Sequence, residues 1–249
     1  MRHKKPHAPS GICATLSQQT DTPITPPVSG PGFCGQRCLA SGARRLKNRY
    51  GSTLELLAHV QMDYIERETR DLVRIQQCDL LESFHAAQSE YSLATGLAMI
   101  SEITEMVLPE REPAEAMFRL ILLAAGEIER RKDWRLPVCY FAFWTVKLGG
   151  WLPPLDRCGK CGGVLGSRQG YHASWSPGLL CEDCRRPGMR SLSPAARKIA
   201  EILKSERLDK IEDTTVPVAL AEELREAALD WIEHHTERKL ITRGLLETA

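Results

Sequence analysis

The sequence predicts an α+β fold that is mostly helical, in which a partial N-terminal β segment precedes an all-α bundle carrying a four-cysteine zinc knuckle. Three observations lead to this class. Residues 54–64 alternate apolar and polar side chains with the period of two that a half-buried strand shows. Beyond residue 80 the apolar side chains recur at three-, four- and seven-residue steps, which is typical of amphipathic helices. Two Cys-x-x-Cys pairs interrupt the helical pattern.

Length and composition set broad limits. The chain has 249 residues, enough for one large or two modest domains, and its 43% hydrophobic content can form a core. Lys and Arg number 33 against 32 Asp and Glu, so the net charge of +1 gives no overall signal for nucleic acid, and any such surface must be a local cluster. No apolar run approaches the ~18 residues of a membrane span and no signal peptide is apparent, so we expect a soluble, intracellular protein.

Residues 1–40 are rich in Pro, Gly, Ser, Thr and Gln. Segments such as Thr22–Pro27 contain prolines that cannot donate a backbone hydrogen bond to a central strand or continue a helix. We expect a flexible Pro/Gly-rich arm here, without strands.

The stretch that follows, residues 41–80, is predicted to be the β segment, and it opens with a basic loop. Four cations fall within nine residues that contain no acid: Arg44, Arg45, Lys47 and Arg49. Such a cluster suits phosphate groups, although from charge alone an ordinary solvated loop is equally compatible. After it, the alternating stretch at 54–64 and a short apolar run at 72–75 are predicted to pair as antiparallel strands.

Residues 81–249 are predicted to form the helical domain. Proline and glycine mark its boundaries: the first helix should stop before Pro109, the third should end at Gly149 and Gly150, and Ser193 should cap a helix that opens at Pro194. The final helix is predicted to continue into a basic stretch near the C-terminus. The apolar stripes lie at residues 93–107, 117–128, 138–148, 199–203 and 220–231.

A zinc-binding insert is predicted at residues 153–190. Its ligands are Cys158, Cys161, Cys181 and Cys184, whose pairs are separated by the spacing of a tetrahedral four-cysteine site. One structural Zn²⁺ would supply the folding energy that a short insert without a core lacks. Two disulfides would need an oxidising compartment, and a redox dithiol is normally a single Cys-x-x-Cys at a strand-to-helix junction, so neither alternative fits well.

The sequence predicts that the protein is not an enzyme. It contains no G-x-x-x-x-G-K-[ST], no G-x-G-x-x-G after a strand and no H-E-x-x-H, so the usual phosphate-binding and catalytic-zinc motifs are missing. Four thiolate ligands leave no coordination position for a reacting water. A zinc-dependent hydrolase remains an alternative only if one cysteine is not a ligand.

Taken in order, these features resemble the bacterial RecO family. The basic segment at 41–48 is similar to the family's Gly-Ala-Arg segment, residues 148–158 are similar to its lead into the zinc site, and residues 233–243 are similar to its terminal helix. The resemblance covers roughly residues 41–249.

The resemblance implies a DNA-binding mediator of DNA-damage repair and homologous recombination, of the RecF-pathway type. Such a protein binds single- and double-stranded DNA, anneals complementary strands, contacts RecR and single-strand-binding protein, and helps to load the recombinase RecA. It would be cytoplasmic and associated with the nucleoid. The expected phosphate contacts are Arg44, Arg45, Lys47 and Arg49, with a weaker second patch at Arg238, Lys239 and Arg243.

The sequence departs from the family pattern at its N-terminus. The family begins with an OB-fold barrel whose first two strands precede the basic loop, whereas residues 1–40 show no strand pattern. The sequence therefore predicts an incomplete barrel. An alternative function follows from this: a zinc-stabilised protein-interaction module with little or no DNA binding.

Overall fold

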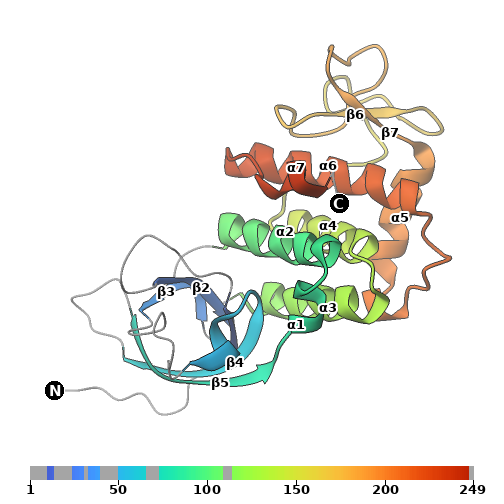
Figure 1. Cartoon of the computed structure of the whole chain (residues 1–249). Helices are drawn as coiled ribbons and strands as arrows, with labels where there is room; N and C mark the ends of the chain where they lie inside the picture. Colours follow the sequence, from blue (N-terminus) through green and yellow to red (C-terminus); the bar gives the residue numbers. More distant parts are fainter. Residues whose placement is uncertain are drawn as a thin grey trace.

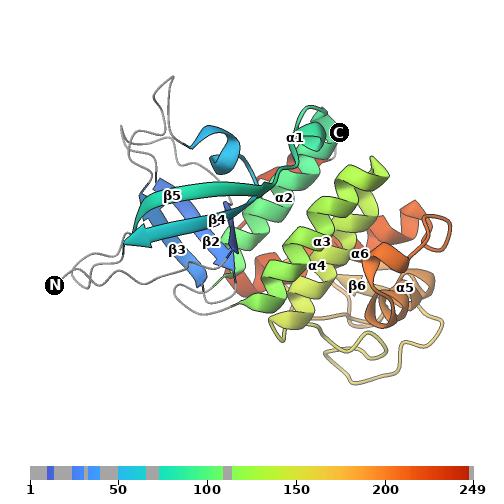
Figure 2. The same cartoon turned by 90° about the horizontal axis from the view of Figure 1, so that it is seen from below.

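A computed structural model describes residues 10–13, 24–30, 33–39, 50–65, 73–108 and 114–246. It has three parts: a β-barrel, a helical domain and a loop-rich insert. Figures 1 and 2 show the barrel at one side of the helices and the insert at the other side; Figure 1 labels the two short strands of the insert, β6 (Gly170–His172) and β7 (Arg190–Leu192). The predicted class, α+β and mostly helical with an N-terminal β segment, is confirmed.

Five strands form the barrel in the order β1-β2-β3-β5-β4, and β1 closes it by pairing with both β2 and β4. Neighbouring strands are antiparallel except β3 and β5, which are parallel. This order is the topology of an OB-fold. The strands are β1 (Ser10–Cys13), β2 (Ile24–Gly30), β3 (Phe33–Leu39), β4 (Ala58–Ile65) and β5 (Val73–Glu82).

The alternating pattern of the β segment is confirmed. Ala58, Val60 and Met62 of β4 are buried and pack with Ile75 of β5, while Gln61 between them is exposed. The strand nevertheless starts later than the apolar pattern suggested, because residues Gly51–Leu54 form the 3₁₀ helix η1. Leu57 then adopts a left-handed conformation at φ 57° that turns the chain into β4.

The strand-free arm and the incomplete barrel are wrong predictions. Strands β1, β2 and β3 lie in residues 10–39, and they complete the barrel. The prolines that argued against strands are accommodated at an irregularity: the register of β2 against β3 shifts between Thr25 and Val28, on either side of Pro26 and Pro27. A bulge tolerates residues that lack an N–H donor, so proline there does not end the strand.

The helical domain is built around α4 (Arg135–Leu148), which packs against α2 (Tyr91–Val107), α3 (Glu115–Arg131) and α6 (Val218–Thr236). Ten of the fourteen α4 residues are buried. A helix that other helices cover on most sides carries apolar residues around most of its circumference, which explains the cluster of aromatic side chains on α4. The remaining helices are α1 (His85–Gln88), α5 (Pro194–Ser205), η2 (Leu208–Lys210) and α7 (Thr242–Leu246).

The predicted helix boundaries are confirmed at three places. Helix α4 ends at Leu148, directly before Gly149 and Gly150. Helix α2 ends at Val107, before Pro109. Helix α5 opens at Pro194, and the Ser193 hydroxyl accepts a hydrogen bond from the Ala196 N–H at 3.1 Å, as a helix cap does. Among the described helices, none has both the length and the apolar character needed to cross a membrane.

The single final helix is a wrong prediction, since two helices occupy that stretch. Helix α6 stops at Thr236, where Glu237 adopts a left-handed conformation at φ 54°. The Glu102 carboxylate on α2 then accepts hydrogen bonds from the N–H groups of Ile241 and Thr242, at 2.7 and 2.9 Å, and so caps the start of α7. The partner that breaks the helix lies far away in sequence, so the local pattern does not reveal it.

Candidate metal centre and nucleic-acid interface

The four predicted zinc ligands come together. The Sγ atoms of Cys158, Cys161, Cys181 and Cys184 all lie within 4.8 Å of one another. A tetrahedral site with Zn–S bonds of about 2.3 Å has sulfur–sulfur edges of about 3.8 Å. The Sγ atoms of Cys161 and Cys181, which belong to different pairs, lie 3.8 Å apart. This pair has the separation of a tetrahedral edge, and all four sulfurs are close enough for one metal ion to bind them together.

Backbone hydrogen bonds shape the two cysteine pairs. The Gly162 N–H donates to the Cys158 carbonyl at 2.9 Å, and the Cys158 N–H donates to the Gly163 carbonyl at 2.9 Å. Gly162 has φ +72°, a conformation that glycine adopts without strain, so the chain can reverse directly after Cys161. In the second pair, the Cys184 and Arg185 N–H groups donate to the Cys181 carbonyl at 3.1 and 2.9 Å. Each pair is thus a tight turn that presents its sulfurs inward.

The thiols of the cluster differ in acidity. Burial raises the pKa of Cys158, but hydrogen bonds to its sulfur from backbone N–H groups, including those of Lys160 and Cys181 at 3.4 Å, outweigh burial and lower the pKa to about 6. Neighbouring sulfurs, led by that of Cys181, together with burial raise the pKa of Cys184 to about 12. Four adjacent thiolates repel one another, and a bound cation relieves that repulsion. The donor set therefore fits a divalent metal.

A buried ion-pair network fixes the insert to the helical domain. The His172 ring on β6 (Gly170–His172) lies 2.7 Å from the Asp230 carboxylate on α6, and both side chains are 1% exposed. Arg190 on β7 (Arg190–Leu192) and Arg243 on α7 also donate to Asp230, the latter at 2.9 Å. Burial raises the pKa of Asp230, but the hydrogen bonds from His172 and Arg190 and the charge of Arg243 outweigh burial and hold it at about 2. One carboxylate thus joins two insert strands to two helices.

A buried arginine on α5 holds the start of the insert. The Arg197 guanidinium donates to the carbonyls of Leu155, Gly166 and Arg168 at 2.8, 2.8 and 2.6 Å. Arg197 is 8% exposed. Three backbone acceptors from one loop fix that loop against the helix, which complements the contact made by Asp230 at the other side of the insert.

The basic loop residues Arg44, Arg45, Lys47 and Arg49 lie outside the described residues. The next residue, Tyr50, is 3% exposed and belongs to the small core of the barrel. The buried Tyr50 ring therefore packs in the barrel core and offers no surface on which a base could stack.

The second predicted patch divides into different environments. Arg238 is exposed directly after α6. Lys239 is exposed as well, but its ammonium donates to the Glu233 carboxylate at 2.8 Å. Arg243 is mostly buried and pairs with Glu226 at 2.6 Å in addition to Asp230. The structure therefore places Arg243 in the network that holds the insert, and leaves Arg238 as the most available cation of the three.

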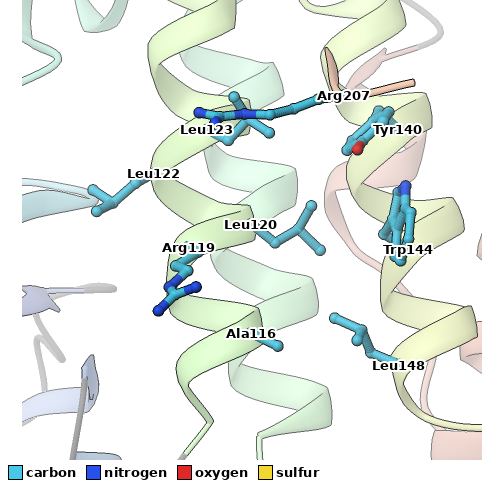
Figure 3. Close-up of a pocket in the computed structure, with 9 residues that line it drawn as sticks. All are labelled: Ala116, Arg119, Leu120, Leu122, Leu123, Tyr140, Trp144, Leu148 and Arg207. Carbon is cyan, nitrogen blue, oxygen red and sulfur yellow. The ribbon is translucent and has the colours of Figure 1, made fainter. Parts of the chain in front are cut away.

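An apolar groove of about 610 Å³ lies between α3 and α4. Figure 3 shows Leu120 and Ala116 of α3 facing Trp144, Tyr140 and Leu148 of α4. Leu148 is 44% exposed, which is unusual for a leucine on the central helix of a domain. Arg119 and Arg207 also line the groove, so cations flank an apolar floor. The apolar stripe predicted for this helix gave no sign that one end of it is open to solvent.

Comparison with known proteins places these features in context. The family model described as Recombination protein O C terminal matches residues 88–243. The DNA repair protein RecO of Koribacter versatilis (strain Ellin345) is 34% identical over 209 residues, covering 84% of this chain and 85% of the relative. The DNA repair proteins RecO of Syntrophobacter fumaroxidans and of Nocardioides sp. are 31% and 30% identical, and each match covers 85% of this chain and at least 85% of the relative. The similarity thus extends beyond the helical domain into the β segment.

Proposed function

Because the chain belongs to the RecO family of DNA repair proteins, we propose that it is a recombination mediator that binds DNA, anneals complementary single strands and helps to load a recombinase onto them. It would do so without catalysing a reaction, as a cytoplasmic protein of the bacterial nucleoid. Annealing needs only a basic surface that offsets phosphate repulsion between two strands while their base edges stay free to pair.

The closed barrel is the observation that carries this proposal. OB-folds bind oligonucleotides on the barrel face, and five strands in OB order surround a small core here. The alternative, an interaction module that binds little or no DNA, drew its support from an incomplete barrel. With the barrel closed, that argument no longer applies. Arg44, Arg45, Lys47 and Arg49 precede β4 and are the proposed phosphate contacts, with Arg238 and, more weakly, Lys239 and Arg243 as the second patch.

Replacing Arg44, Arg45, Lys47 and Arg49 together by alanine is expected to weaken binding of a single-stranded oligonucleotide and to flatten its salt dependence. Each lost phosphate contact should lower the slope of log K against log salt by about 0.7 on a single strand, so the four-fold variant should lose between about 1 and 3 units of slope. Fluorescence anisotropy titrations at several salt concentrations measure this slope.

The matched control removes four cations from the helical domain instead, namely Arg135, Lys198, Lys204 and Lys210. It changes the net charge by the same amount without touching the barrel loop. An equal loss of slope in both variants would mean that total charge, and not the loop, determines DNA binding.

Protein partners are the second part of the proposal: RecR and single-strand-binding protein, and through them RecA. The groove between α3 and α4 supports a docking function, because its apolar floor is open. Arg119 and Arg207 beside it pair with Glu115 and Asp209 at the surface, so a partner segment that combines apolar and acidic side chains can fill the floor and replace these pairs. We propose the groove as the site for such a segment.

Leu148→Glu is expected to abolish this docking, since it places a carboxylate on the apolar floor and offsets the two arginines. Retention of single-strand-binding protein and of RecR on the immobilised variant tests this. Val218→Glu is the control, because Val218 has a similar exposure of 47% and lies outside the groove. Full retention of both partners by Leu148→Glu would contradict the assignment.

For the four cysteines, the proposed cofactor is one structural Zn²⁺. Four close sulfur donors are the usual shell of a structural zinc, and in such a closed shell the metal stabilises a fold instead of activating water. The zinc-dependent hydrolase would require a water in place of one sulfur.

A further inference from the structure

A turn of the insert presents a tryptophan to solvent. The Ser176 N–H donates to the Ala173 carbonyl at 2.9 Å, and the Ser176 hydroxyl donates to the Gly178 carbonyl at 3.0 Å. Ala173 and Ser176 are buried, at 6% and 4% exposure, whereas Trp175 between them is 48% exposed. The backbone of the turn is therefore fixed by hydrogen bonds while its largest side chain points outward. Core packing does not explain that side chain.

Cations surround this tryptophan. The Arg186 guanidinium lies 5.6 Å from the centre of the Trp175 ring, and the Arg185 guanidinium lies 4.9 Å from the centre of the Tyr171 ring. The Lys239 ammonium donates to the Ser174 hydroxyl at 2.7 Å, so the basic segment after α6 adjoins the same turn. Residues distant in sequence thus form one surface, with an exposed ring and basic side chains around it.

Two cations of this region are available to a ligand: Arg186 beside the Trp175 ring, and Arg238, which directly precedes Lys239. Arg185 pairs with Glu182 at 2.8 Å and Lys239 pairs with Glu233 at 2.8 Å, so their charges are largely matched within the chain. Arg186 and Arg238 are both exposed, and across the described part of the chain neither has a carboxylate partner. A ligand of this surface should therefore be anionic and should offer a flat apolar face for Trp175.

We propose that Trp175, Arg186 and Arg238 form a second binding site for single-stranded nucleic acid, on the insert and separate from the barrel. A base stacks on Trp175, Arg186 binds a phosphate beside that base, and Arg238, next to the Lys239 that contacts the same turn, binds a further phosphate. The inference rests on the proposed function, since the ligand is the single strand that the protein is proposed to anneal. Figures 1 and 2 place β6 and β7 on the side of the helices away from the barrel, so one chain would hold two strands at once. The Arg186 guanidinium lies beside the ring, and a single strand supplies both a base for Trp175 and a phosphate for Arg186.

The test uses the full zinc-loaded chain and a fluorescein-labelled oligo(dT). Trp175→Ala is expected to weaken binding about 5- to 10-fold, whereas Trp175→Phe, which keeps a stacking ring, should stay within about 2-fold of the wild type. On an abasic oligonucleotide of equal length, which retains the phosphates but offers no base, Trp175→Ala and the wild type should bind alike. Tyr91→Ala removes an aromatic ring of 62% exposure on α2 and is the control.

The salt dependence of DNA binding tests the two arginines. Arg186→Ala and Arg238→Ala should each lower the salt slope by about 0.7, and zinc content and thermal midpoint should match the wild type, which excludes an unfolded insert. Wild-type affinity for oligo(dT) in Trp175→Ala overturns this second site and leaves the barrel proposal intact. Unchanged DNA binding together with lost retention of single-strand-binding protein assigns the surface to a protein, which also overturns it. A wild-type chain that binds no DNA refutes the proposed function and this inference together.

Discussion

Replacing Cys158 by serine is expected to abolish metal binding and to unfold the insert at residues 153–190. Cys158 is only 2% exposed. Its sulfur accepts hydrogen bonds from the backbone N–H of Lys160 in the first Cys-x-x-Cys turn and of Cys181 in the second, so it is the centre of the cluster. Structural zinc contributes roughly 10–16 kcal/mol of apparent binding free energy in small zinc domains, and an insert held by turns has no large core to replace it. The variant should lose stoichiometric zinc and become susceptible to protease within the insert.

Cys139→Ala is the matched control for this experiment. Cys139 is buried on α4 and is not one of the four cysteines whose sulfurs lie together, so its replacement leaves the metal site intact. This variant should keep full zinc content and lose only packing energy. Proton-induced X-ray emission on both purified proteins measures the metal per chain. Stoichiometric zinc in Cys158→Ser, or none in the wild-type protein, would refute the structural zinc.

The ligand set could be predicted from the sequence because metal sites of this type are local. Cys158 and Cys161 belong to one turn, Cys181 and Cys184 to another, and spacing alone specifies both turns. The cap at Ser193 is predictable for the same reason, since its acceptor and donor are three residues apart. Where a few consecutive residues determine the structure, the sequence is sufficient.

The barrel shows where local patterning fails. Residues 24–30 contain two prolines and no clean alternation, yet they form a strand, because β3 supplies the pairing and the register shift absorbs the prolines. Propensity in a strand depends on its neighbours, and the neighbours are set by the topology. The same holds at Glu102, whose cap on α7 spans more than a hundred residues of sequence.

The contacts that position the insert could not be predicted from the sequence either. His172 and Asp230 are 58 residues apart, and no motif links them. Arg243 is an example: the sequence placed it in a predicted DNA-binding patch, whereas three carboxylates surround it in the structure. Trp175 and Arg186 likewise become neighbours only through the fold of the insert. A basic residue near a terminus can be assigned a role only when its partners are known.

Asp230→Ala is expected to destabilise the protein by about 3–5 kcal/mol, which corresponds to a fall in thermal midpoint on the order of 10 °C. The variant removes the buried carboxylate that joins the insert to the helices, so the buried His172 ring loses its partner, while Arg190 and Arg243 keep Glu226 and Arg243 also keeps Glu233. Glu115→Gln is the control: its ion pair with Arg119 is exposed and one turn apart on α3, so its loss should cost at most about 0.5 kcal/mol. Urea titrations of both variants measure the free energies of unfolding.

The pH dependence provides a second readout of the same network. The folded pKa of Asp230, about 2, lies below its ordinary value of 3.8, so the ionised carboxylate stabilises the fold above about pH 4. That contribution, about 2 kcal/mol, is lost as the pH falls from about 4 towards 2. The wild-type protein should therefore lose stability over this range more steeply than Asp230→Ala, which has no carboxyl group left to protonate. Parallel stability curves for the two proteins between pH 4 and pH 2 would show that Asp230 is not the anchor of the insert.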